Sequence, residues 1–125
     1  MPQTPDVGDP AAVGVHLIVD LFGACRLDDE ALMRSTLQAC VKAAGATLLH
    51  LHLHRFTEHG GLSGVVVLAE SHIAVHTWPE TGFAAFDLFM CGQADPRLAL
   101  PALMAAFEPQ DVSLREIQRG PRLSA

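Results

Sequence analysis

The 125-residue chain is 50% hydrophobic and has a formal net charge of −6, from 14 acidic and 8 basic residues. This length and composition favour a single domain with a substantial core. Because the basic residues form no cluster, the charge pattern argues against nucleic acid or an anionic membrane as a partner.

Residues 1–12 are polar, contain three prolines and predict a flexible N-terminal arm, so we expect one domain over residues 13–125. The start of the chain lacks the basic segment and the following apolar segment that are typical of a secretory signal. No apolar run approaches the roughly 20 residues that cross a bilayer. We therefore expect a cytoplasmic protein.

The first half of the domain predicts a strand, a helix and a second strand. Residues 13–21 are rich in β-branched and aliphatic side chains, as in a strand. Residues 28–44 begin with three acidic residues, repeat apolar positions at helical spacing and end before Gly45, as in a helix. In residues 47–56, leucine alternates with histidine, which predicts Leu49, Leu51 and Leu53 in the core and His50, His52 and His54 on the other face.

The second half predicts an antiparallel meander followed by a helix and a strand. Strands are expected at residues 64–69, 72–77, 83–90 and 112–117. Asp95 and Pro96 suit the start of a helix running to Phe107, in which Pro101 implies a kink or a later start. The predicted fold class is α+β, a two-layer α/β sandwich in which both helices pack on one face of an antiparallel sheet.

Several kinds of cofactor chemistry are not supported by the sequence. Lys42 is the only lysine and lies inside the predicted helix, whereas pyridoxal phosphate normally needs a lysine for its Schiff base. The phosphate-binding patterns GxGxxG and GxxxxGK[ST] are missing, as is the nucleophile pattern GxSxG. The three cysteines include no CxxC pair, which argues against a disulfide framework. The reactive side chains are concentrated between Ser63 and Cys91.

Three segments in and just before this region resemble the small prokaryotic S-adenosylmethionine decarboxylases, which are made as proenzymes. They are HRF at residues 54–56, SGVVVLAESHIAVHTWPE at residues 63–80 and GFAAFDLFMCG at residues 82–92. A weaker match covers GVHLIVDLFGAC near the N-terminus, so the resemblance extends over most of residues 13–92.

The resemblance implies that Ser71 becomes a pyruvoyl group. In this family the serine hydroxyl attacks the preceding carbonyl, here that of Glu70, and β-elimination then cuts the chain. The products would be a β chain of residues 1–70 and an α chain of residues 71–125. Ser63 and His76 would assist this processing.

The same resemblance implies the roles of the remaining residues. Ser71, as pyruvoyl, would form a Schiff base with the substrate amine, and Cys91 would return a proton to carbon. Phe56, Trp78 and Glu80 would bind the substrate. S-adenosylmethionine is the expected substrate and its decarboxylated product the aminopropyl donor for spermidine, with ornithine or arginine as an alternative for the same chemistry. The family also implies a homodimer of αβ units.

Two features depart from a simple match. Ser71 and His76 are five residues apart, so in a regular strand they would face opposite sides, which leads us to expect a bend or bulge near the cleavage point. The loop before Ser63 is one residue longer than the usual family spacing and contains Gly60-Gly61.

Some of these residues also fit purely structural or metal-binding roles. Ser63 could be an ordinary turn serine and Cys91 a packing residue. His50, His52 and His54 could belong to a metal-binding or interaction domain that never cleaves, because HLHRFTE resembles half of a cupin metal site.

Overall fold

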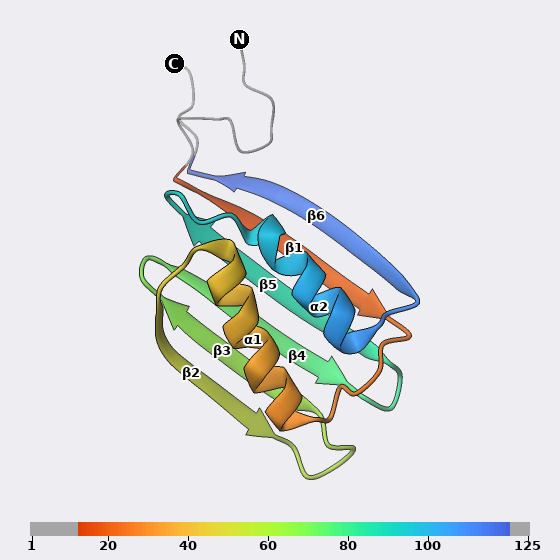
Figure 1. The fold of residues 1–125 in the computed structure, drawn as a ribbon. Coiled ribbons are helices and arrows are strands. Elements are labelled where there is room, and N and C mark those ends of the chain that lie inside the picture. The colour runs from red at the N-terminus through yellow and green to blue at the C-terminus, as the bar shows by residue number, and fades with distance from the viewer. Residues whose placement is uncertain (1–12, 121–125) are drawn as a thin grey trace.

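Six antiparallel strands form one sheet in the computed structural model of the chain, which describes residues 13–120 (Figure 1). The predicted arm at residues 1–12 lies outside the described residues. In chain order the elements are β1 (Gly14–Phe22), α1 (Glu30–Ala44), β2 (Leu48–Arg55), β3 (Leu62–Leu68), β4 (Ser71–Trp78), β5 (Phe83–Cys91), η1 (Pro96–Ala99), α2 (Leu100–Phe107) and β6 (Asp111–Arg119). The strand order across the sheet is β2-β3-β4-β5-β1-β6.

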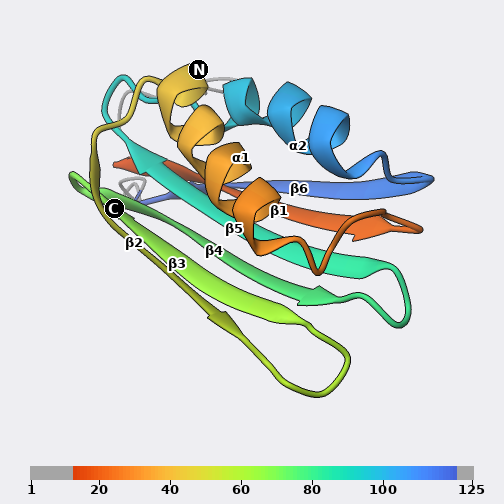
Figure 2. The ribbon, with the colours of Figure 1, turned by 60° about the horizontal axis from the view of Figure 1, so that its bottom comes forward.

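Both helices lie on the same face of the sheet, which confirms the predicted two-layer α+β sandwich (Figure 2). The core lies between the layers, because alternate strand residues and one stripe of each helix lose their contact with water. Its largest fully buried side chains are Phe86, Phe107, Leu21, Met33, Leu37, Leu62, Ile73, Leu88, Met90, Leu103, Val19 and Val66.

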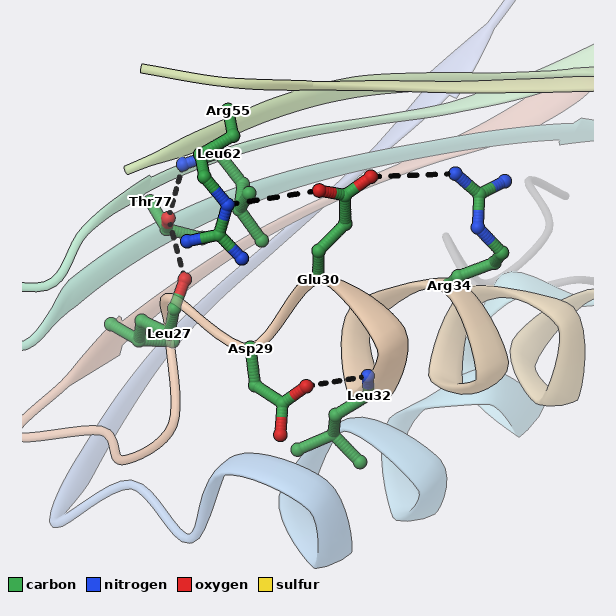
Figure 3. Close-up of polar contacts among 8 residues, drawn as sticks. All are labelled: Leu27, Asp29, Glu30, Leu32, Arg34, Arg55, Leu62 and Thr77. Carbon is green, nitrogen blue, oxygen red and sulfur yellow. Dashed lines mark hydrogen bonds and ion pairs between the residues drawn. The ribbon is translucent and has the colours of Figure 1, made fainter. Parts of the chain in front are cut away.

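The helix ends follow their local sequence signals. The Asp29 carboxylate accepts a hydrogen bond from the Leu32 backbone N–H at 2.9 Å and caps α1 (Figure 3). Gly45 ends α1 in the left-handed region, at φ 80°. The later helix begins as the short 3-10 segment η1, and Pro101 falls in the first turn of α2. The predicted later start is therefore confirmed.

Strand β2 departs from the predicted alternation at Leu49. Leu48 pairs with Leu68 but His50 pairs with Val67, so Leu49 is an extra residue in a bulge. Its side chain is 62% exposed. The prediction that Leu49 faces the core was wrong, whereas Leu53 is buried and Leu51 partly buried as expected.

The strand ends shown in Figure 3 are tied to the helical layer by polar contacts. The buried Thr77 hydroxyl accepts a hydrogen bond from the Leu62 N–H and donates one to the Leu27 carbonyl, both at 2.9 Å. Glu30 lies 3.7 Å from Arg55 Nε, joining α1 to the end of β2. These contacts fix the strand ends that lead into the loops at residues 57–61 and 79–82.

The second face of the sheet has no helix over it in the part of the chain that the structure describes (Figure 2). Alternate strand residues point to this face, among them exposed apolar side chains. These are Phe22, Val65, Val67, Trp78 and Ile117. We call this surface the open face. Among the described residues, the helices are too short or too polar to cross a membrane.

Candidate active site

Ser63 and His76 form a hydrogen-bonded pair on the open face. They lie directly opposite each other in the β3–β4 ladder, and Ser63 Oγ is 2.9 Å from His76 Nδ1. An imidazole at this distance can accept a proton from the hydroxyl or return one. Strand β3 begins at Leu62, so Ser63 is the second residue of this strand and does not lie in a turn.

His54 lies on the other side of Ser63. It pairs with Ser63 in the β2–β3 ladder, and its ring meets that of Phe56 edge-on at a centroid distance of 4.7 Å. Cross-strand neighbours on one face have close Cβ atoms, so Ser63 is flanked by two imidazoles. The sequence indicated His54 as part of the HRF segment and of a polar strand face, but not its place beside Ser63, because strand neighbours are not visible in the sequence.

A cavity of about 510 Å³ opens beside the Ser63–His76 pair. Its lining includes five residues to which the sequence resemblance gave a role in processing or substrate binding, namely Phe56, Ser63, His76, Trp78 and Glu80. Its lining residues are Phe56, Thr57, Glu58, His59, Gly61, Ser63, His76, Thr77, Trp78 and Glu80. The Phe56 and Trp78 side chains remain 49% and 42% exposed, so their aromatic faces are available to a ligand. The sequence suggested Glu58 only as part of the cupin-like HLHRFTE pattern and did not suggest His59, although both closely follow the HRF segment.

The Glu70–Ser71 peptide lies at the other end of β4, in the tight turn between β3 and β4. Leu68 pairs with Ser71, which leaves only Ala69 and Glu70 in the turn. Glu70 has φ 64°, a left-handed conformation that costs a residue with a Cβ atom conformational energy. The turn therefore stores strain next to the peptide bond expected to be cleaved.

Ser71 and Cys91 lie close together at this end of the sheet. The Cys91 backbone N–H donates a hydrogen bond to Ser71 Oγ at 3.0 Å. Cys91 ends β5 opposite Gly14, where an added Cβ atom would lie 3.0 Å from the Cys91 Sγ. Because Gly14 has no side chain, it leaves room for the thiol, which is only partly buried.

The expected bend between Ser71 and His76 is absent. Strand β4 pairs with β3 and β5 from Ser71 to Trp78 without a register shift. Five residues at about 3.3 Å each separate the two by about 16 Å, and strand alternation points their side chains to opposite faces. The prediction of a bend was wrong because two neighbouring ladders hold β4 regular. Within one chain, the residues expected to form the active site therefore lie in two separate groups. One contains Ser63, His76 and the cavity, and the other contains Ser71 and Cys91.

A polar cluster that the sequence did not indicate lies on the open face near Cys91. His16 Nε2 is 3.1 Å from Asp87 Oδ1, and the Arg119 guanidinium lies 5.4 Å from the centre of the Phe89 ring. The His16 and His72 rings also contact the Phe89 ring, with centroids 6.1 Å and 5.7 Å away. These residues belong to four strands, so only the sheet order brings them together.

The histidine face of β2 does not form a metal centre. His50, His52 and His54 follow one another at every second residue along an edge strand, which spaces neighbours by about 6.6 Å. Within residues 13–120, no three His, Cys, Asp or Glu side chains are grouped so that they could hold a metal ion.

Comparison with known proteins identifies the family. The family model described as S-adenosylmethionine decarboxylase matches residues 15–120. The S-adenosylmethionine decarboxylase proenzyme of Synechococcus sp. (strain WH7803) is 46% identical over 110 residues, covering 86% of this chain and 85% of its own. The proenzyme of Thermomicrobium roseum is 37% identical over 110 residues, covering 87% and 95%. The crystal structure of the adenosylmethionine decarboxylase from Aquifex aeolicus has a TM-score of 0.76 and 32% identity, covering 91% of this chain and 96% of that one. The chain described here belongs to the S-adenosylmethionine decarboxylase family.

Proposed function

We propose that this chain is a self-processing decarboxylase of S-adenosylmethionine whose catalytic group is made from Ser71. The observation that supports this most directly is the turn at Glu70 and Ser71. A strained residue precedes a serine whose Oγ accepts a hydrogen bond from the Cys91 backbone N–H. Family membership independently supports the same activity.

The processing step uses only atoms of the chain and one water molecule. Ser71 Oγ attacks the carbonyl carbon of Glu70, the C–N bond breaks, and an ester replaces the amide. Loss of the Ser71 α-proton then expels the Glu70 carboxylate, which cuts the chain and leaves dehydroalanine. Water converts this group to pyruvoyl and releases ammonia. The left-handed Glu70 favours the first step, because breaking this peptide bond relieves its strain.

A homodimer would supply the groups that one chain cannot bring to Ser71. Glu70 is exposed and Ser71 only partly buried, so the turn is open to a neighbour. If two open faces pack about a two-fold axis that makes their β4 strands antiparallel, the partner's His76 and Ser63 approach the turn. The exposed apolar side chains of the open face favour burial in such an interface.

Each predicted residue then has a defined role. The Ser63–His76 pair accepts and returns protons during processing. Phe56 and Trp78 hold the flat and cationic parts of the substrate, and Glu80 adds a hydrogen-bond acceptor at the cavity.

The reaction itself needs an electron acceptor and a proton donor. A pyruvoyl group supplies a carbonyl that takes up the electrons left when carbon dioxide departs from the substrate. Cys91 holds the proton that must return to carbon. The product would be decarboxylated S-adenosylmethionine, the aminopropyl donor for spermidine. The three unpaired thiols agree with the reducing conditions of the cytoplasm, where we place this activity.

Mass analysis of the purified, denatured protein tests this proposal. We expect fragments of 70 and 55 residues, the shorter one carrying pyruvoyl at its N-terminus, and a single intact chain from Ser71→Ala. Carbon dioxide release is then compared for S-adenosylmethionine, ornithine and arginine. An active preparation that stays one intact chain would refute the pyruvoyl assignment, and release only from ornithine or arginine would refute the substrate assignment.

A further inference from the structure

The loop between β2 and β3 is a defined turn that forms one wall of the cavity. The Phe56 N–H donates a hydrogen bond to the Gly61 carbonyl at 2.8 Å and closes the loop. Gly61 packs so tightly on β4 that an added Cβ atom would lie 2.7 Å from the Thr77 carbonyl oxygen. His59 and Gly60 have φ values of 67° and 72°, which turn the chain sharply. The loop therefore presents its side chains in a fixed direction.

The charges around this cavity favour a cation. Glu58 comes from this loop and Glu80 from the turn after β4, and both turns lie at the same end of the sheet because the strands are antiparallel. Among the described residues, no lysine or arginine lines the cavity. The adjacent Arg55 is directed to the helical layer, where it meets Glu30. Two carboxylates and two exposed aromatic rings are the groups that attract a positively charged ligand.

Glu58 has its carboxylate available for a ligand. Its side chain is 88% exposed, and its Oε2 lies 4.0 Å from His59 Nε2, at the limit of an ion pair.

We propose that Glu58 is a specificity-determining residue that selects substrates by the positive charge of the sulfonium group. This inference rests on the proposed function, because it concerns the substrate of the same site. It predicts that the cavity prefers S-adenosylmethionine to S-adenosylhomocysteine, which has the same adenosyl and amino-acid parts but a neutral sulfur. Glu58 would provide part of this preference, and Glu80 and the aromatic rings the remainder.

The test compares Glu58→Gln with wild type and with two control variants. Glu58→Asp keeps the charge in the loop, and Glu108→Gln removes an exposed carboxylate at the end of α2, outside the cavity lining. We expect Glu58→Gln to process normally and keep its kcat, with KM for S-adenosylmethionine raised about two- to fivefold at low salt, the size of effect that a solvated ion pair produces. The Ki of S-adenosylhomocysteine should not change. Glu58→Asp should be close to wild type, and Glu108→Gln should equal it.

Binding is also measured without turnover, in the intact Ser71→Ala protein. Calorimetry should show that adding Glu58→Gln weakens the affinity for S-adenosylmethionine by the same two- to fivefold factor. High salt should make this difference in affinity smaller. An unchanged affinity, or an equal loss for S-adenosylhomocysteine, would overturn the role of Glu58 and leave the decarboxylase proposal intact. If the wild-type protein makes no pyruvoyl but Glu58→Gln still weakens the binding of S-adenosylmethionine, only the decarboxylase proposal would be overturned. Wild-type protein that does not bind S-adenosylmethionine would overturn both.

Discussion

Two inactive variants should restore each other if the active site is completed by a second chain. Ser71→Ala removes the proposed pyruvoyl precursor, and His76→Ala removes the imidazole that contacts Ser63. Within one chain, the regular strand separates residues 71 and 76 by about 16 Å, far beyond the roughly 3 Å of a hydrogen bond. Under the proposed function, His76 would therefore act on the Ser71 of a partner chain.

The arrangement predicts how much activity returns. In a dimer of one Ser71→Ala chain and one His76→Ala chain, one site combines an intact Ser71 with an intact His76, and the other site lacks both. The isolated mixed dimer should have about half the activity of the wild-type dimer, because one of two symmetric sites works. Two different affinity tags on co-expressed chains allow the mixed dimer to be purified. Mass analysis then shows whether the His76→Ala chain has been cut.

The two pure variant dimers provide the control, because each should be inactive for its own reason. If His76 acted on the Ser71 of its own chain, neither chain of the mixed dimer could be both processed and active. A mixed dimer with no cleavage and no activity would therefore refute the reasoning. So would a protein that remains monomeric while fully active.

Four further predictions concern single residues. Thr77→Val should lower the free energy of unfolding of the Ser71→Ala protein by about 2–3 kcal/mol, because the buried Leu62 N–H loses its acceptor, whereas Thr77→Ser should lose less; urea titration measures both. Cys91→Ala should be processed but should lower kcat at least about 100-fold, and normal turnover would exclude Cys91 as the proton donor. Burial raises the pKa of the Cys40 thiol to about 12, so maleimide should leave Cys40 unmodified at pH 8 until the protein is denatured, while the exposed Cys25 reacts; a peptide map that shows Cys40 labelled in the native protein would contradict this. Glu70→Gly should stabilise the Ser71→Ala protein by about 0.5–1 kcal/mol and, with Ser71 present, slow its cleavage, whereas faster cleavage would argue against stored strain.

The sequence determined the elements and their faces where the signals were local. Helix α1 has its acidic start and its glycine end within the chain segment itself, and these match the observed cap and left-handed Gly45. Alternation in β2 placed Leu53 in the core, where it is buried. Local patterns suffice here because hydrogen bonds and burial along one helix or strand depend on residues a few positions apart.

The sequence also indicated which residues to group as a site, through the resemblance of the segments that contain them. It indicated Glu58 only as the carboxylate of the cupin-like HLHRFTE pattern, and it did not indicate His16 or Asp87. The resemblance is read segment by segment, whereas these residues meet groups on other strands and loops. The bulge at Leu49 was missed for a related reason, since the register of β2 is decided by its partner β3.

Only the tertiary structure decided how the site is divided. The sequence placed Ser71 and His76 close together and led to the expectation of a bend, because five residues is a short separation along the chain. In the sheet, ladders on both sides keep β4 extended, so the same five residues span most of its length. Ser71 meets Cys91, which is 20 residues away in sequence, and His76 meets Ser63. Proximity in an extended strand depends on which neighbours the sheet provides, and a single strand's sequence does not specify them.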